Sequence, residues 1–258
     1  MKPIISWGKN KSYDINMIMP FLDQSLNNNA ITQYIEPFAG SASIFFYLSS
    51  YFERKNIHSV LNDINEDLIN FYKQIKDDKG NEIKSFMDTH QNNKETYYDI
   101  LHNYCPTTSI EQASQFYYLR KTCHRSMLRF NKLGQFNVAY GNNHTIDYNN
   151  LTDIRYKNAL QNTKLLNTDF LSIFREYNNP ENFIFIDPPI NYYFKNDAVN
   201  QFTQEDHINL FRVFSENQSK CIGLFKETAF IKELYINHII AAYPCSNHKG
   251  TKLIVSNF

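Results

Sequence analysis

The sequence predicts an α/β protein built on a mostly parallel sheet, and three observations support this class. Short apolar runs rich in β-branched and aromatic residues recur along the chain, and the clearest run, residues 183–186, is typical of a strand buried on both faces. Segments with helical spacing alternate with these runs. Several runs end at an acid, as this one does at Asp187. Ligands of open α/β sheets bind outside the carboxyl ends of the strands, so these acids are candidate site residues.

Composition fits one α/β domain of ordinary size with a smaller insertion. The 258 residues are 42% hydrophobic and 16% aromatic, enough for a full core. Neither a run of about 18 apolar residues nor a signal-like segment occurs, so we expect a soluble, cytoplasmic protein without a membrane partner. The four cysteines lie far apart without a Cys-x-x-Cys pair, which favours buried reduced thiols over a metal site or disulfides.

Charge is balanced overall but not along the chain. The net charge is zero and the pI is near 7.1, so bulk charge gives no support for nucleic-acid binding. No acid occurs between Glu111 and Asp147, however. This acid-free window contains the basic residues Arg120, Lys121, Arg125, Arg129 and Lys132. Such a local positive field predicts a surface that faces an anion such as a phosphate backbone, with a solvated basic face as the alternative.

Residues 5 to 21 begin as a loop that contains Gly8 and continue as a helix with apolar spacing near 3.6. A glycine and two lysines, Lys9 and Lys11, at the start of a helix can hold an anion at its N-terminus. This pattern alone is weak, because many solvated loops share it.

Residues 33 to 46 predict a short strand, a tight turn of small residues and a helix that begins near Ser41 or Ala42. This geometry lets the backbone approach a nucleoside ligand closely. The segment lacks both the Gly-x-Gly-x-x-Gly fingerprint and the Gly-Lys-Ser/Thr of a P-loop.

The next predicted strand ends at Asp63, about 20 residues past the glycine turn, where an acid can accept hydrogen bonds from ribose hydroxyls. The alternative role of Asp63 is an N-cap for a helix over residues 66–72, and both roles can hold together. Leu165 to Phe170 predicts another short strand that ends in an acid, Asp169. Further on, we expect a helix over residues 204–216 and strands over 221–225 and 253–255.

Residues 73 to 118 are helix-like and carry no recognisable chemistry. Residues 128–131 and 135–140, around Leu133-Gly134, predict a β-hairpin with a glycine turn inside the acid-free window. Arginine and asparagine in this hairpin are the residue types that read guanine and adenine edges.

Together these motifs resemble the adenine-specific DNA methyltransferase family (Dam-like, alpha class), over nearly the whole chain. The phrases that carry the resemblance are Trp7-Gly8-Lys9, Glu36-Pro37-Phe38-Ala39-Gly40-Ser41, Leu61-Asn62-Asp63-Ile64-Asn65, Arg129-Phe130-Asn131 with Gln135-Phe136-Asn137, and Asp187-Pro188-Pro189. The family's Asp-Pro-Pro-Tyr motif ends here in Ile190. The resemblance implies a Rossmann-like sheet from residues 1–72 and 156–258, with 73–155 inserted as a smaller, mainly helical target-recognition domain that carries the hairpin.

The resemblance also implies a reaction: transfer of a methyl group from S-adenosylmethionine to the exocyclic amino group of an adenine flipped out of double-stranded DNA. No metal is needed. The implied cofactor-binding residues are Trp7, Gly8, Lys11 or Lys9, Glu36, Phe38, Gly40, Ser41, Asp63, Asp169, Phe170 and Asp187. The implied catalytic residues are Asp187, Pro188, Pro189 and Ile190. The implied DNA-binding residues are Arg125, Arg129, Asn131, Lys132 and Asn137.

A rival interpretation is a protein of the same fold that binds DNA or a partner without turnover, and Ile190 is its main support. An RNA adenine methyltransferase is less favoured, because the hairpin matches the DNA family. The recognised sequence, the oligomeric state and a role in restriction, a phage or a bacterial host do not follow from the sequence.

Overall fold

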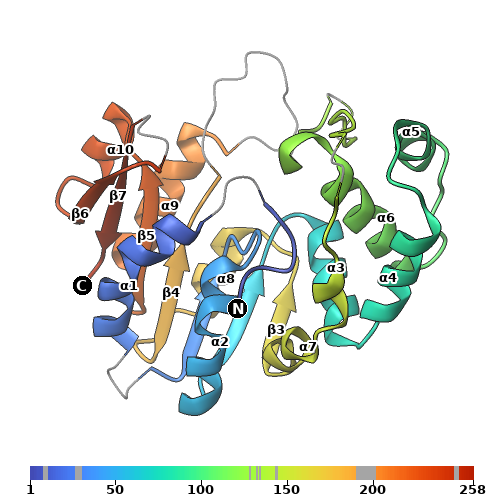
Figure 1. Cartoon of the computed structure of the whole chain (residues 1–258). Helices are drawn as coiled ribbons and strands as arrows, with labels where there is room; N and C mark the ends of the chain where they lie inside the picture. The colour runs from blue at the N-terminus through green and yellow to red at the C-terminus, as the bar shows by residue number, and fades with distance from the viewer. Residues whose placement is uncertain are drawn as a thin grey trace.

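The computed structural model describes residues 1–7, 11–26, 31–127, 129–131, 133, 135–142, 145–189, 202–246 and 250–258. Its strands are β1 (Gln33–Glu36), β2 (His58–Asn62), β3 (Thr163–Leu166), β4 (Asn182–Ile186), β5 (Lys220–Lys226), β6 (Ile239–Pro244) and β7 (Thr251–Ser256). The described strands form one seven-stranded sheet in the order β3-β2-β1-β4-β5-β7-β6 (Figure 1). The first five of these pair in parallel, and β7 runs antiparallel between β5 and β6. After β1 the chain continues to β2 on one side, and after β4 it continues to β5 on the other side. The position between β1 and β4 is therefore the topological switch point, where sheets of this kind bind ligands.

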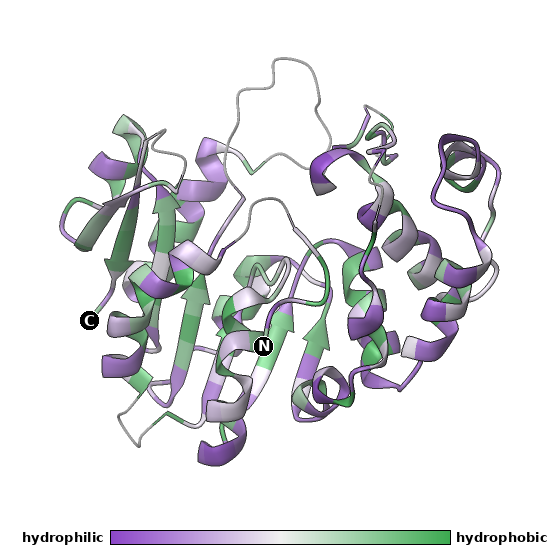
Figure 2. Cartoon of the chain, viewed as in Figure 1, coloured by the Kyte–Doolittle hydropathy of each residue, from purple (hydrophilic) through white to green (hydrophobic). Residues whose placement is uncertain are grey.

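Helices cover both faces of the sheet, so that the strands separate two cores. The first core lies under α1 (Ser12–Leu26), α2 (Ser43–Lys55), α3 (Glu66–Lys76) and α7 (Ile154–Gln161), and the second under α8 (Phe170–Glu176), α9 (Gln204–Glu216) and α10 (Ala229–Leu234). In β4, Phe183 and Phe185 belong to the first core, whereas Ile184 and Ile186 belong to the second. Burial on both faces explains the continuous apolar run in the sequence, and the central strands are the most hydrophobic ribbons in Figure 2.

An insertion lies beyond the β3 edge of the sheet, at the right of Figure 1. It contains α4 (Gly80–Thr89), α5 (Lys94–His102), α6 (Ser109–Thr122) and the short 3-10 turns η1 (His124–Ser126) and η2 (Asn149–Thr152). The insertion packs on α3, where the Phe71 and Tyr117 rings stack with centroids 5.2 Å apart. Its buried aromatic residues belong to the first core, so the insertion and the sheet share one hydrophobic interior.

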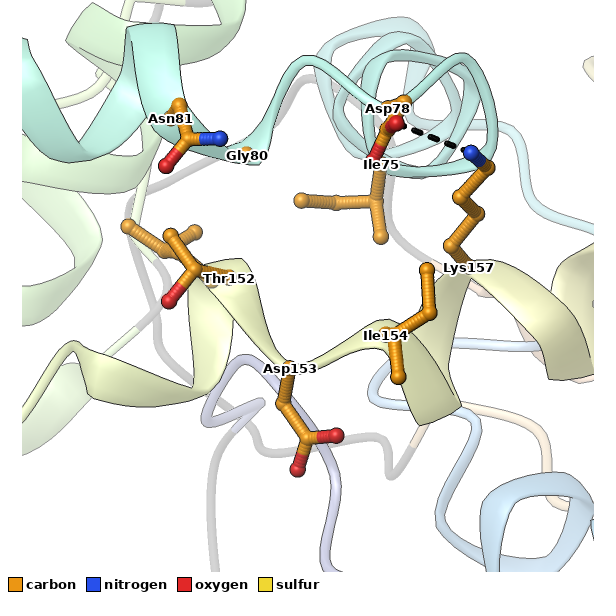
Figure 3. Close-up of a pocket in the computed structure, with 9 residues that line it drawn as sticks. Ile75, Asp78, Gly80, Asn81, Thr152, Asp153, Ile154 and Lys157 are labelled. Carbon is orange, nitrogen blue, oxygen red and sulfur yellow. Dashed lines mark hydrogen bonds and ion pairs between the residues drawn. The ribbon is translucent and has the colours of Figure 1, made fainter.

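The insertion leaves and rejoins the sheet domain at one place. Gly80 starts α4 so close to η2 that a Cβ on it would lie 1.9 Å from the carbonyl oxygen of Leu151. Beside this contact Lys157 Nζ lies 2.8 Å from Asp78 Oδ2 (Figure 3). The cavity between these segments measures about 30 Å³, which is room for a single water rather than a cofactor.

Most predicted elements are confirmed, with three differences. The predicted helix over residues 204–216 is α9, and the predicted strands at 221–225 and 253–255 are β5 and β7. The helix after the small-residue turn begins at Ser43 because Ala42 adopts a positive φ of 49°. The strand predicted over Leu165 to Phe170 already ends at Leu166, and Phe170 begins α8. The predicted hairpin pairs its two arms at Phe130–Phe136, with Asn131 N–H donating to the Gln135 carbonyl, and Leu128, Lys132 and Gly134 lie outside the described residues. Strand β6 was not predicted.

Candidate active site

Acidic side chains meet at the carboxyl ends of four neighbouring parallel strands. Glu36 ends β1, Asp63 follows β2, Asp169 follows β3 and Asp187 follows β4. Because these strands run in parallel, their carboxyl ends lie along the same edge of the sheet, as the sequence predicted. This edge is therefore the candidate active site.

Asp63 holds the turn after β1. Its Oδ2 accepts the N–H of Gly40 at 2.9 Å, and its Oδ1 accepts the N–H of Asn65 at 2.9 Å. Burial raises the pKa of Asp63, and these two hydrogen bonds act in the opposite direction. The alternative role as a helix N-cap is wrong, because Asn65 caps α3 by accepting the N–H of Leu68 at 2.8 Å.

Asn62, which sequence reasoning missed, links the turns after β1 and β3 to the end of β2. Its Nδ2 donates to the carbonyl oxygens of Pro37 at 2.9 Å and Thr168 at 3.0 Å, and its Oδ1 accepts the N–H of Thr168 at 3.0 Å. The side chain is 1% exposed. A polar residue that closes an apolar strand is a signal that could have identified this role.

Gly40 lies beneath the indole of Trp7. Its φ is +48°, and a Cβ on it would lie 2.9 Å from Trp7 Cδ1, so both the backbone and the space require glycine here. The Tyr72 hydroxyl donates to the Gly40 carbonyl at 2.8 Å. The hydroxyl of the neighbouring Ser41 is buried and shares a 2.7 Å hydrogen bond with Ser43. Ser41 therefore supports the turn with its side chain.

Glu36 is a buried carboxyl group, only 3% exposed. Its Oε1 accepts the Tyr34 hydroxyl at 2.7 Å and the Phe45 N–H at 2.9 Å. Burial raises the pKa of Glu36 to about 8; the two hydrogen bonds lower it and the charge of Asp187 raises it further. Both donors among the described residues use Oε1, and none of those residues donates to Oε2.

Lys11 and Asp187 form an ion pair, with Nζ 2.5 Å from Oδ2 and side chains 21% and 24% exposed. Burial lowers the pKa of Lys11, but the charge and the hydrogen bond of Asp187 outweigh this, so that the pKa is raised. Lys11 is held in place through α1, because Asp14 in its first turn binds Lys252 Nζ at 2.5 Å and the Tyr243 hydroxyl at 3.0 Å.

Three aromatic rings pack together next to the end of β3, where Phe170 directly follows Asp169. Phe38, Phe170 and Phe202 contact one another with centroids 5.4 to 5.5 Å apart. Asp169 caps α8, since its Oδ1 accepts the N–H of Ser172 at 3.0 Å and its Oδ2 accepts the Ser172 hydroxyl at 2.6 Å. The hydroxyl bond is the main cause of the lowered pKa of Asp169. Phe202, on the far side of the Asp-Pro-Pro segment, was not predicted.

The remaining predicted site residues are placed as follows. Pro188 is buried and Pro189 is exposed directly after Asp187. Gly8, Lys9, Lys132 and Ile190 lie outside the described residues.

Arg129 lies on the exposed surface of the predicted hairpin. Its Nε donates to Asn137 Oδ1 at 2.9 Å and its Nη2 to the Asn137 carbonyl at 2.8 Å. Asn131 Oδ1 accepts the N–H groups of Leu133 and Gln135 at 2.9 and 3.0 Å. The two asparagines therefore shape the hairpin with their side-chain oxygens.

The basic window does not form one surface. Arg125 is exposed and has a positive φ of 53°. Arg120, by contrast, is 2% exposed, so the expectation of a solvent-facing charge was wrong for this residue. Arg120 lies on the inner side of α6, where its neighbours are aromatic rings.

A cavity of about 530 Å³ separates the hairpin from α5 and α6. Amide and aromatic side chains dominate its lining, among them Gln112, Gln115, Phe116, Asn131, Phe136 and Asn137. It extends to Asn65 at the start of α3, beside Asp63. The hairpin thus stands over space that continues toward the sheet edge.

The described ranges contain neither a group of metal ligands nor a membrane-spanning helix. No three His, Cys, Asp or Glu side chains of these ranges are grouped so as to hold a metal ion. None of the helices in the described part of the chain combines the length and apolarity that crossing a membrane demands.

Comparison with known proteins connects this site to a family. The family described as D12 class N6 adenine-specific DNA methyltransferase matches residues 16–244. The chain is 36% identical over 243 residues to the Type II methyltransferase M.CviBI of Paramecium bursaria Chlorella virus NC1A, covering 94% of this chain and 90% of the relative.

Two further relatives come from an archaeon and a bacterium. The Type II methyltransferase M.MjaIII of Methanocaldococcus jannaschii is 35% identical over 204 residues, covering 73% of this chain and 69% of that protein. The DNA adenine methylase of Haemophilus influenzae is 29% identical over 197 residues, covering 73% of this chain and 63% of that protein. The family match spans both parts of the sheet domain and the insertion, and we conclude that this chain belongs to the D12 class of N6 adenine-specific DNA methyltransferases.

Proposed function

We propose that the chain transfers a methyl group from S-adenosylmethionine to N6 of an adenine in double-stranded DNA, with the cofactor at the carboxyl edge of β1, β2 and β3 and the adenine at Asp187. The observation that carries this proposal is the set of acids at that edge. Asp187 pairs with Lys11 and Glu36 feels the charge of the same lysine, whereas Asp63 is bound by backbone N–H groups. Such a site suits a ligand that brings both an ammonium and a sulfonium group.

The residues fit this cofactor group by group. The donors described above leave Glu36 Oε2 free, so this oxygen can accept a hydrogen bond from the ammonium of the methionine part. Asp63 stands beside Gly40, whose lack of a side chain allows close backbone approach, and is placed for the ribose hydroxyls. The rings of Phe38 and Phe170 offer a stacking surface for the adenine part.

The cofactor supplies an activated methyl group, and its sulfur keeps the bonding electron pair when the methyl leaves. The protein's own contribution is positioning. Asp187 Oδ1 and the Pro188 carbonyl accept the two N–H groups of the target amine, and Lys11 holds the other carboxylate oxygen, Oδ2. The proton that the nitrogen loses after N–C bond formation passes to solvent.

The target base must leave the duplex to reach Asp187, which costs a few kcal/mol. We place the DNA on the hairpin side of the molecule, since Arg125 and Arg129 are exposed there without an acid in the surrounding sequence window. Phosphate contacts from such residues make binding dependent on salt.

The direct experiment incubates the protein with labelled S-adenosylmethionine and unmethylated AT-rich genomic DNA, followed by nucleoside analysis. We expect N6-methyladenine from wild type and none from Asp187→Ala. The exposed acid of α1 in Asp23→Ala serves as the matched control and should leave activity unchanged. Methylation by Asp187→Ala at the wild-type rate would reject the assigned role.

The cofactor pocket can be tested without turnover. S-adenosylmethionine, or its demethylated product S-adenosylhomocysteine, should raise the melting temperature of the protein by mass action. Asp63→Ala removes the carboxylate that holds Gly40 and should reduce this shift. Calorimetry that detects no binding of either compound at micromolar concentration would remove both the cofactor assignment and the catalytic proposal.

A further inference from the structure

We propose that Arg120 couples DNA binding at the hairpin to cofactor binding at the sheet edge, acting as a positioning residue rather than a catalytic one. The proposal rests on the proposed function for the existence of the two sites. It goes beyond it by naming the physical link between them.

One guanidinium group joins two distant segments of the chain. Arg120 Nη2 donates to the carbonyl oxygens of Ser6 at 2.9 Å and Ser126 at 2.8 Å, and Nη1 donates to the carbonyl of Met127. Ser6 precedes Trp7, and Ser126 and Met127 lead into the hairpin. A displacement of the hairpin base is therefore transmitted to the segment that contains Ser6 and Trp7.

Trp7 carries the link to the cofactor pocket. The Arg120 guanidinium lies over the Trp7 ring, 5.0 Å from its centroid. The same ring covers Gly40, whose N–H donates to Asp63. The chain of contacts thus runs from the hairpin base through Arg120 and Trp7 to the two residues assigned to the cofactor.

Arg120 is not arranged as an ordinary stabilising ion pair. It is 2% exposed, and among the described residues no carboxylate forms a salt bridge with it. Its Nε is buried without a hydrogen-bond partner, and burial lowers its pKa. Three carbonyl hydrogen bonds and the Trp7 ring offset part of the cost of burying this charge, but no described carboxylate does, and well-packed apolar residues often replace such buried charges without loss of stability. What the guanidinium offers instead is a rigid fork that binds several carbonyls at once.

The cavity beneath the hairpin allows the link to move. Close-packed interiors resist deformation, but here about 530 Å³ of space separates the hairpin from α5 and α6, and Arg120 and Phe136 both line it. The guanidinium also lies 6.0 Å from the centroid of the Phe136 ring. DNA that presses on the hairpin can therefore shift it, and Arg120 converts that shift into a movement of Trp7.

The chain provides its own probe, because Trp7 is its only tryptophan. We would record tryptophan emission and the Kd of S-adenosylhomocysteine, each with and without an unmethylated AT-rich duplex. In wild type we expect the duplex alone to change the emission of Trp7 and to change the Kd by about fivefold or more, the usual range of a coupling between sites.

Arg120→Met should bring the ratio of the two Kd values to one while each ligand still binds. Arg155→Met is the matched control, since this arginine of α7 is exposed, pairs with Asp153 and should keep the wild-type ratio. If Arg120→Met does not fold, as judged by circular dichroism, Arg120→Gln takes its place. Glutamine is uncharged, and its shorter side chain cannot keep the three carbonyl hydrogen bonds that join the two segments, so the ratio should again fall toward one.

The outcomes separate the two proposals. Wild type that binds neither the product nor DNA would contradict the proposed function itself. Wild type that binds both, with equal Kd values and an unchanged Trp7 emission on adding DNA, would overturn the coupling. A wild-type ratio retained in the Arg120 variants would also overturn it, because a merely structural arginine alters stability but not this ratio.

Discussion

Replacing Glu36 by glutamine should stabilise the free protein at neutral pH and at the same time weaken cofactor binding. The carboxyl group is 3% exposed and its pKa is raised by burial from the ordinary 4.5 to about 8. Between these two values the folded state keeps a proton that the unfolded state has lost. The stability that this proton gives is complete below about pH 4.5 and is lost as the pH rises through about 8.

The magnitude follows from the width of that window. Each pKa unit corresponds to about 1.4 kcal/mol, so at pH 7 the unfavourable contribution of Glu36 is at most about 3 kcal/mol. Glutamine keeps an oxygen that can accept from Tyr34 and Phe45 and carries no titrating proton. The variant should therefore exceed wild type in unfolding free energy by an amount that grows with pH and reaches about 3 kcal/mol near neutrality.

Urea denaturation without cofactor, from about pH 5 to about pH 8, measures this difference. Glu53 is an exposed glutamate on α2, so the unfolding free energy of Glu53→Gln should vary with pH as that of wild type does. Cofactor affinity should fall about tenfold or more in Glu36→Gln, since the glutamine oxygen replaces Oε1 and its NH2 group, which cannot accept from the methionine ammonium, replaces Oε2. If the unfolding free energies of Glu36→Gln and wild type differ by the same amount at every pH in this range, the reasoning is refuted, because Glu36 would then be charged in the free protein.

Three further predictions concern the turn, the motif and the hairpin. Gly40→Ala should lower stability by about 1 to 2 kcal/mol through its positive φ and should displace Trp7, so an unchanged tryptophan emission would count against the described contact. Ile190→Tyr should raise methylation about tenfold by restoring base stacking; if wild type and variant both bind cofactor and DNA yet transfer no methyl group, the binding-protein interpretation replaces the enzyme. Arg129→Ala should weaken DNA binding and reduce its salt dependence by about one ion, whereas Arg155→Ala should not, and equal binding by both would place the DNA elsewhere.

The sheet was largely predictable because strands buried on both faces are apolar throughout. The run at residues 183–186 met this condition and is β4. Strand β6 did not, since it lies at the sheet edge, pairs on one side only and exposes Ile240 and Pro244. An edge strand needs less apolar surface and therefore gives a weaker signal.

The acids of the site were predictable because each follows a strand end, whereas their partners depend on the tertiary fold. Phe202 reaches the site from a position that no local spacing distinguishes, and for Asn62 the only local signal is that a polar residue ends an apolar strand. Arg120 shows the limit most clearly. Its place in a basic window suggested solvent, but α6 turns it into the interior toward Ser6, which is 114 residues away in sequence.

The contact between Gly80 and Leu151 has an evolutionary consequence. Because the chain leaves and re-enters the sheet domain at touching points, everything between them can lengthen, shorten or be exchanged by recombination without stretching the catalytic frame. The exchanged segment must still match the surface on which it packs, which includes the stack of Phe71 on Tyr117 and the hydrogen bond from Arg120 to Ser6. On our proposal that DNA binds at the hairpin, a new DNA specificity would be acquired as one inherited block, while the residues at the sheet edge stay unchanged.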